Sequence, residues 1–256
     1  MATIVLVHGA WLGGWVWSRV VPDLWARGHT VYAPTLTGLG DRTHLLDTDV
    51  DLDLHAADVV SLLECEDLQR VLLVAHGYGG AVAQRVAALA PERLGRFLFL
   101  DALLAEKGQT LLAALGPHAA ALQTRAEDAD GVPVYAPDLG LLLDGLVKRD
   151  ADWVEDRLAP MPAASYTAQL DAAGFFTLGK PLLFVTCADG DPAASAALAR
   201  AHGFATHEIA APHLPMIAKV EPTAELIDNF ARQPARTLQP GGDAAGAGDT
   251  SPAPAP

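Results

Sequence analysis

The chain has 256 residues, of which 51% are hydrophobic and 19% are charged, so it can bury one large core and is neither disordered throughout nor fibrous. Lys and Arg number 17 and Asp and Glu number 31, which gives a formal net charge of −14. Because this charge repels nucleic acids and anionic membranes, we expect a small-molecule substrate as the partner, with no nucleic acid and no membrane.

Short apolar runs alternate with helical patterns along the chain. The expected strands are residues 4–8, 30–33, 71–76, 96–101, 182–187 and 206–210, and the expected helices are residues 14–26, 54–64, 80–90, 191–202 and 223–232. This alternation predicts an α/β fold, with a mostly parallel sheet of about six strands flanked by helices. Active sites in such folds lie beyond the carboxyl ends of the strands, so the residues that follow each strand are the candidates for function.

Two segments depart from the alternation. Between Asp101 and Lys180 lie about eighty residues with helical patterns and no clear strand, which is too long for an ordinary connection. We expect this insertion, about residues 103–179, to form a helical lid over the active site. From Gln233 onward the chain is rich in Pro, Ala and Gly, so residues 234–256 are predicted to be a disordered tail behind an α/β domain of residues 1–233.

The third expected strand leads into a glycine-rich turn and a helix, in the sequence VLLVAHGYGGAVAQ. A strand, a sharp turn and a helix are the context of the nucleophile elbow, G-x-S-x-G. Here Ala75 replaces the first glycine and Gly77 stands at the nucleophile position. Since Gly77 has no side chain, the elbow carries no atom that could form an acyl-enzyme.

Two later strand ends complete a recognisable order. Asp189 follows the strand at 182–187, and His213 follows the strand at 206–210. Nucleophile position, acid and histidine follow one another in this order in α/β-hydrolases. Asp191 is the alternative acid, and Asp101 is expected to cap or support the turn after the fourth strand.

The segments LVHGAW, APTLTGLGDRTHLL, VAHGYGGAV, FLDALLAEKGQ, WVEDRLAPMP and PHLPMI resemble the methylesterase and hydroxynitrile-lyase-like branch of the α/β-hydrolases, which is common in bacterial secondary metabolism. The resemblance covers about residues 3–232 and implies the α/β-hydrolase fold. It also implies an oxyanion hole built from the backbone N–H groups of Ala10 or Trp11 and of Tyr78. It further implies that Asp189 orients His213 and that the Tyr78 side chain points away from the nucleophile position.

The residues that surround the site in this family are partly aromatic here, which favours an apolar, aromatic or polyketide-like substrate. Arg42 and His44 either contact a polar rim of the substrate or anchor their own loop. The candidate substrate-binding residues are His8, Trp15, Arg42, His76, Tyr135, Trp153 and Tyr166.

Three functions fit an elbow without a nucleophile. In the first, His213 and its acid perform general acid/base catalysis of a cyclisation, elimination, isomerisation or C–C lyase step, while the oxyanion hole holds an enolate. In the second, His213 activates a water that attacks an ester, lactone or epoxide. In the third, the protein binds a ligand without catalysis. We favour the first, and a Ser→Gly change made in the laboratory would give the same sequence.

The remaining signals are negative. The nine histidines form no metal-binding pair at helical spacing, and the dinucleotide-binding motif does not occur, so we expect no cofactor and no metal. Cys65 and Cys187 fit neither a disulfide framework nor a zinc motif. No signal peptide or apolar run of roughly 18 residues is visible, which predicts a cytoplasmic protein.

Overall fold

The computed structural model describes residues 1–188 and 193–234. Its main sheet has six strands in the order β2-β1-β3-β4-β8-β9, and all neighbouring strands are parallel. The strands are β1 (Thr3–Val7), β2 (Thr30–Tyr32), β3 (Val71–His76), β4 (Leu94–Leu100), β8 (Leu182–Cys187) and β9 (Ala205–Ile209). The α/β fold and the six strands expected from the sequence are therefore confirmed.

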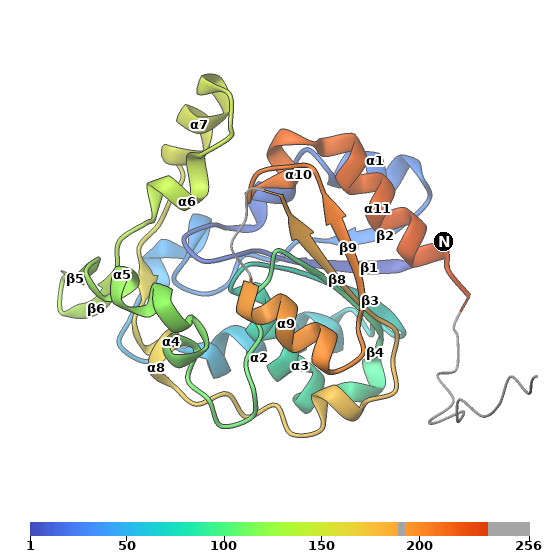
Figure 1. Ribbon diagram of the computed structural model, residues 1–256, viewed down its shortest axis with the longest axis horizontal. Coiled ribbons are helices and arrows are strands. Elements are labelled where there is room, and N and C mark those ends of the chain that lie inside the picture. Colours follow the sequence, from blue (N-terminus) through green and yellow to red (C-terminus); the bar gives the residue numbers. More distant parts are fainter. Residues whose placement is uncertain (189–192, 235–256) are drawn as a thin grey trace, which may run out of the picture.

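Helices cover both faces of this sheet. In Figure 1, α1 (Val21–Ala26) and α11 (Val220–Arg232) lie on one face, and α2 (Leu52–Cys65), α3 (Gly79–Leu89) and α9 (Ala193–Ala201) lie on the other. Because the sheet is covered on both faces, its central strand β3 is buried at every residue and reads as a continuous apolar run. The edge strand β9 is mostly exposed.

The helix expected at residues 14–26 is split into a 3-10 helix, η1 (Gly14–Trp17), and α1. Pro22 occupies the first turn of α1, where its missing N–H is tolerated, and it cannot continue a helix from the N-terminal side. The other short helices outside the insertion are η2 (Gly40–Leu45), η3 (Pro91–Arg93) and α10 (Pro215–Ala218), and η5 (Phe175–Thr177) lies at the end of the insertion, before β8.

The insertion between β4 and β8 lies to the left of the main sheet in Figure 1. It contains the helices α4 (Leu111–Ala114), η4 (Gly116–His118), α5 (Ala119–Gln123), α6 (Leu139–Leu143), α7 (Lys148–Glu155) and α8 (Ala164–Thr167), and the strands β5 (Ala126–Ala129), β6 (Val132–Tyr135) and β7 (Met161–Pro162). The three strands form a small antiparallel sheet in the order β5-β6-β7.

The strands of the insertion correct the expectation of a purely helical segment. They are two to four residues long, too short for a clear alternation of apolar and polar residues. Asp130 and Gly131 join β5 to β6 and both have positive φ, at 53° and 91°. An Asp-Gly pair with two positive φ angles is a hairpin turn, so the sequence did carry a local signal for these strands. Of the expected tail, only Pro234 falls within the described residues.

Candidate active site

The turn between β3 and α3 has the backbone of a nucleophile elbow. Gly77 follows β3 directly and has a φ of +52°, in the left-handed region. A Cβ atom at this position would lie 3.7 Å from Nε2 of His213 and 3.3 Å from the Cα atom of Gly9. The nucleophile position therefore faces the imidazole of His213 across a narrow gap.

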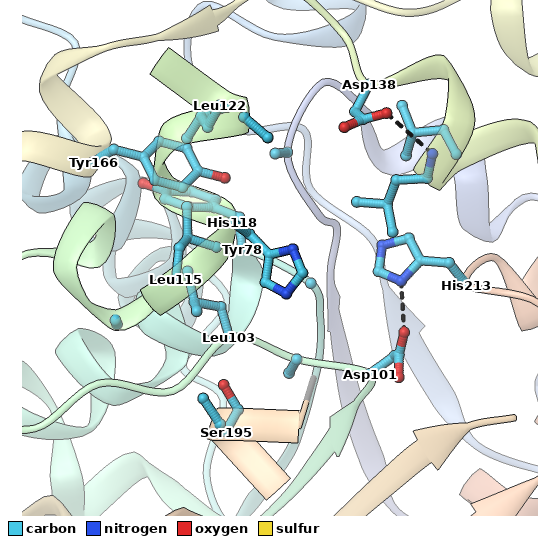
Figure 2. Close-up of a pocket in the computed structure, with 18 of the residues that line it drawn as sticks. Tyr78, Asp101, Leu103, Leu115, His118, Leu122, Asp138, Tyr166, Ser195 and His213 are labelled. Carbon is cyan, nitrogen blue, oxygen red and sulfur yellow. Dashed lines mark hydrogen bonds and ion pairs between the residues drawn. The ribbon is translucent and has the colours of Figure 1, made fainter. Parts of the chain in front are cut away.

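His213 is paired with a buried carboxylate. Its Nδ1 lies 2.6 Å from Oδ2 of Asp101, and the dashed line in Figure 2 marks this contact. Since a carboxylate only accepts hydrogen bonds, Nδ1 carries the proton and Nε2 presents its lone pair towards Gly77. The other carboxylate oxygen of Asp101, Oδ1, accepts the backbone N–H of Cys187 at 3.0 Å, which ties the pair to the end of β8.

The acid is not the one that the sequence suggested. Asp189 and its alternative Asp191 lie outside the described residues, whereas Asp101 holds the only proton-bearing nitrogen of the His213 ring. Among the described residues, Asp101 therefore makes the contact that was expected of Asp189, and the expectation for Asp189 itself lies outside the described residues. Asp101 also follows a strand of the sheet directly, so the rule that located Asp189 applied to it equally.

His76 contacts His213 through a hydrogen bond and through its ring. Its Nε2 donates to the carbonyl oxygen of His213 at 2.8 Å, and the two ring centroids are 4.5 Å apart. Burial, followed by the proximity of His213, holds the pKa of His76 well below its usual value. His76 therefore stays neutral beside His213. It was expected to bind substrate, but it is buried behind the elbow and is not among the described residues that line the cavity.

A cavity of about 600 Å³ opens above the elbow. Gly77, Asp101 and His213 lie at its base, and the insertion supplies much of its wall. The insertion residues that line it are Leu103, Ala114, Leu115, Pro117, His118, Ala121, Leu122, Asp138, Leu141, Leu142 and Tyr166. Most of these side chains are apolar, so the cavity suits a largely apolar ligand.

The expected oxyanion-hole residues also border this cavity. Ala10, Trp11 and Tyr78 all line it beside Gly77. Trp11 has a φ of +64°, and its indole N–H donates to the carbonyl oxygen of Tyr135 at 2.9 Å. The Tyr78 hydroxyl donates to Nδ1 of His55 at 2.8 Å, so its side chain is held away from the elbow.

Of the candidate substrate-binding residues, Tyr166 alone lies among the described residues of the cavity wall. Tyr135 is buried and packs edge-on against Tyr166, with ring centroids 5.9 Å apart. Trp15 and Trp153 pack against each other in a T-shaped pair at 5.1 Å. These three aromatic side chains support the wall from outside or pack elsewhere, so the expectation that they line the pocket is not met.

His8 and Arg42 hold loops in place. Nδ1 of His8 donates to the carbonyl oxygen of Gly9 at 2.8 Å, and Nε2 accepts the backbone N–H of Leu36 at 3.0 Å. Arg42 donates to the carbonyl oxygen of Thr35 at 2.9 Å and to Asp58 at 3.1 Å. Both residues secure the loop after β2, and these contacts favour loop anchoring for Arg42.

The apolar cavity wall was not predicted from the sequence. Leu115, Leu122, Leu141 and Leu142 line the pocket, but their leucine-rich segments indicated only helices. Such a segment does not reveal whether a given leucine faces the core or a cavity. His118, at the end of η4, was also not singled out and contributes a polar side chain to the wall.

Within the described ranges, no group of three potential His, Cys, Asp or Glu ligands is arranged to hold a metal ion. The helices in the same ranges are all too short or too polar to cross a membrane.

Comparison with known proteins places the chain among hydrolases. Residues 4–228 match the Alpha/beta hydrolase family. The chain is 36% identical to a carbendazim hydrolyzing esterase of Nocardioides sp. over 200 residues, covering 75% of this chain and 82% of the esterase. It is 31% identical to putative methylesterase 14 of Arabidopsis thaliana over 106 residues, covering 41% of this chain and 30% of that protein.

Among solved structures, an extracellular alpha/beta-hydrolase from a Paenibacillus species superimposes with a TM-score of 0.80 at 25% identity, covering 91% of this chain and 100% of that one. The fold, the elbow between β3 and α3 and the family match over most of the chain agree. The protein belongs to the alpha/beta hydrolase family.

Proposed function

We propose that the protein hydrolyses small, largely apolar esters by direct attack of a water molecule that His213 activates, without an acyl-enzyme. The observation that carries this proposal is the position of His213. Its Nε2 faces Gly77, where a nucleophilic side chain would stand, while its Nδ1 is fixed by Asp101. The base of a hydrolase is thus in place, and the elbow supplies no attacking atom.

A water molecule fits the role of the attacking group. A Cβ at Gly77 would lie 3.7 Å from Nε2 and 3.9 Å from Cε1 of His213, so a hydroxyl group on that carbon would come within hydrogen-bond reach of Nε2. The share of liquid volume of one water is about 30 Å³, similar to that of a hydroxymethyl group. In our proposal, a water therefore binds beside Gly77 and donates to Nε2 of His213.

The reaction then balances with water as the only co-reactant. Nε2 takes a proton from the water as its oxygen attacks the ester carbonyl carbon, and the carbonyl oxygen becomes an oxyanion. Backbone N–H groups of Ala10 or Trp11 and of Tyr78 hold this oxyanion. The imidazolium gives its proton to the departing alkoxide, and the products are an acid and an alcohol.

The general base and the oxyanion hole are expected to contribute substantially to the rate. A positioned general base contributes about 10²–10⁴ in rate. One donor of an oxyanion hole contributes about 10²–10³ in rate in a protease. Asp101 keeps the correct tautomer and stabilises the imidazolium in our scheme. In our proposal, the Asp101–His213 pair and the oxyanion hole thus provide the means for hydrolysis without covalent catalysis.

The relatives support hydrolysis over the non-hydrolytic reactions that we favoured from the sequence. Of the two relatives described above, the one that aligns with this chain over more residues is an esterase, and the alignment covers three quarters of this chain. A cyclisation, elimination, isomerisation or C–C lyase step on a polyketide-like substrate is the second candidate. The geometry that favours it is the same: Nε2 could take a proton from carbon, and the hole could hold an enolate.

A product analysis with a series of aryl esters that share one acyl group and differ in the leaving group tests the proposal. If water attacks the ester directly, products are released at a steady rate without a burst. When methanol is added, the ratio of acid to methyl ester formed then changes with the leaving group, because the leaving group is still present when water or methanol attacks. An acyl-enzyme common to all the esters would instead give a burst of the released alcohol. It would also give the same ratio of acid to methyl ester for every leaving group. The His213→Ala variant serves as the control for background hydrolysis. A burst equal to the enzyme concentration in the wild type would overturn the proposed mechanism.

A further inference from the structure

We infer that the hydroxyl group of Tyr166 forms a second, hydrogen-bonding subsite of the cavity, which selects neutral substrates carrying an acceptor such as a ketone oxygen away from the scissile ester. This inference rests on the proposed function for the orientation of the ester at His213. It adds to the proposed function the class of substrate that the insertion selects.

Most polar groups of the described cavity wall are already engaged. The Tyr78 hydroxyl bonds to His55, and Oγ of Ser195 accepts the backbone N–H of Leu104 at 2.9 Å. Asp138 accepts the backbone N–H of Leu141 at 3.1 Å and pairs with Arg125 at 3.0 Å. Asp101 is held by His213. These groups therefore have little capacity left for a ligand.

Tyr166 differs from them. Its side chain is buried with the residue only 4% exposed, yet in the part of the chain that the structure describes its hydroxyl has no hydrogen-bond partner. In Figure 2 this hydroxyl is directed towards the middle of the cavity. A polar group so shielded from bulk water gains from a partner that a ligand brings, because leaving it unpaired is unfavourable.

The ring of Tyr166 is held rigidly. Its centroid lies 5.6 Å from that of Tyr78 and 5.9 Å from that of Tyr135. Burial raises the pKa of Tyr166 above its usual value, so the hydroxyl stays protonated and able to donate. A fixed, neutral donor in an apolar wall discriminates between ligands better than a mobile one, because less entropy is lost when the bond forms.

Charge restricts the acceptor to a neutral group. The described residues of the cavity wall include Asp101 and Asp138 but no Lys or Arg. A carboxylate on the substrate would face these two acids, and Arg125, which pairs with Asp138, does not itself line the described cavity wall. His118 also lines the insertion side, but it is exposed, so water competes for its ring nitrogens.

The test uses two esters of the same shape, methyl 6-acetyl-2-naphthoate and methyl 6-ethyl-2-naphthoate. They differ by a carbonyl oxygen at the end far from the ester. We expect the wild type to prefer the acetyl ester roughly three- to tenfold in kcat/KM, the effect of one neutral hydrogen bond, mainly through KM. Tyr166→Phe removes only the hydroxyl and should abolish this preference.

Tyr135→Phe is the matched control, because it removes a hydroxyl from a neighbouring buried tyrosine outside the cavity wall, and it should keep the preference. Dissociation constants of both esters in His213→Ala measure the same ratio without turnover, so the subsite is tested even if the proposed hydrolysis fails. Equal binding of the two esters by a folded wild type, or a preference that persists in Tyr166→Phe, would overturn the inference.

Discussion

Oδ2 of Asp101 lies 2.6 Å from Nδ1 of His213, and this contact joins the end of β4 to the loop after β9. Asp101 has a φ of +48°, an unusual conformation for a residue other than glycine, at the point where the chain leaves β4. Its side chain is only 1% exposed. The carboxylate is thus fixed where it can orient the imidazole.

The first prediction concerns the identity of the acid. Asp101→Asn should lower kcat/KM by about 10²–10⁴, because an amide can stabilise the wrong tautomer and cannot stabilise the imidazolium. Asp189→Asn, at the acid first expected from the sequence, should keep nearly full activity. Steady-state kinetics on the best ester of the panel give both values.

The two variants have opposite expected outcomes, so the comparison is decisive. Circular dichroism and the unfolding temperature would establish that Asp101→Asn is folded. If the larger loss belonged to Asp189→Asn instead, the assignment of Asp101 would have to be withdrawn.

The fold was predictable from the sequence because its signals are local. The buried run of β3 and the glycines after it identify a parallel strand, a tight turn and a helix without knowledge of the rest of the chain. The identity of the acid was not predictable in this way. Both Asp101 and Asp189 follow strands, and the choice between them depends on the side-chain contact with His213.

The same limit explains why most of the expected substrate-binding residues do not line the cavity. Trp15, Tyr135 and Trp153 share their aromatic character with Tyr166, but only the packing of the insertion decides which ring reaches the cavity. Sequence spacing fixes the face of a regular helix or strand, whereas these residues lie on short elements joined by turns. Their side-chain directions therefore carry no periodic signal.

The second prediction separates loop anchoring from substrate binding at Arg42. Arg42→Ala removes the bonds to Thr35 and Asp58 and should lower the free energy of unfolding by roughly 1–2 kcal/mol. KM for the ester should stay within about twofold of the wild-type value, because Arg42 is outside the described cavity wall. Urea unfolding and kinetics on the same preparation check both parts. A large rise in KM with unchanged stability would restore the binding role.

The third prediction concerns acid stability and His8. Burial lowers the pKa of His8 to about 4, against 6.5 for an ordinary histidine. The unfolded chain therefore binds this proton more readily than the folded protein, so stability is complete above pH 6.5 and falls as the pH drops towards 4. The difference corresponds to roughly 3 kcal/mol for this one group.

Urea unfolding between pH 7.5 and pH 4.5 measures this dependence. His8→Gln should be less stable at pH 7.5 but should lose less stability on acidification than the wild type. His44→Gln, at an exposed histidine, is the matched control and should keep the wild-type slope. Parallel curves for all three proteins would show that His8 does not take up a proton on unfolding in this range.

The last prediction concerns Gly77. Gly77→Ser places a hydroxyl within reach of Nε2 of His213, which should permit fluorophosphonate labelling at position 77 and a burst with activated esters. The wild type should resist the label, because its elbow carries no oxygen to modify. The variant should lose roughly 1–3 kcal/mol of stability, since a side chain is added at a φ of +52° and 3.3 Å from Gly9.

Gly77→Ala separates the nucleophile from the steric change. It adds the same Cβ at the same backbone strain without the oxygen, so it should match the stability loss of Gly77→Ser and should not be labelled. Its water-dependent hydrolysis should also fall below that of the wild type, because the methyl group lies 3.7 Å from Nε2, where we place the attacking water. Mass spectrometry of the labelled proteins and kinetics on one ester decide the matter. Labelling of the wild type, or undiminished hydrolysis by Gly77→Ala, would show that the attacking group does not bind beside Gly77.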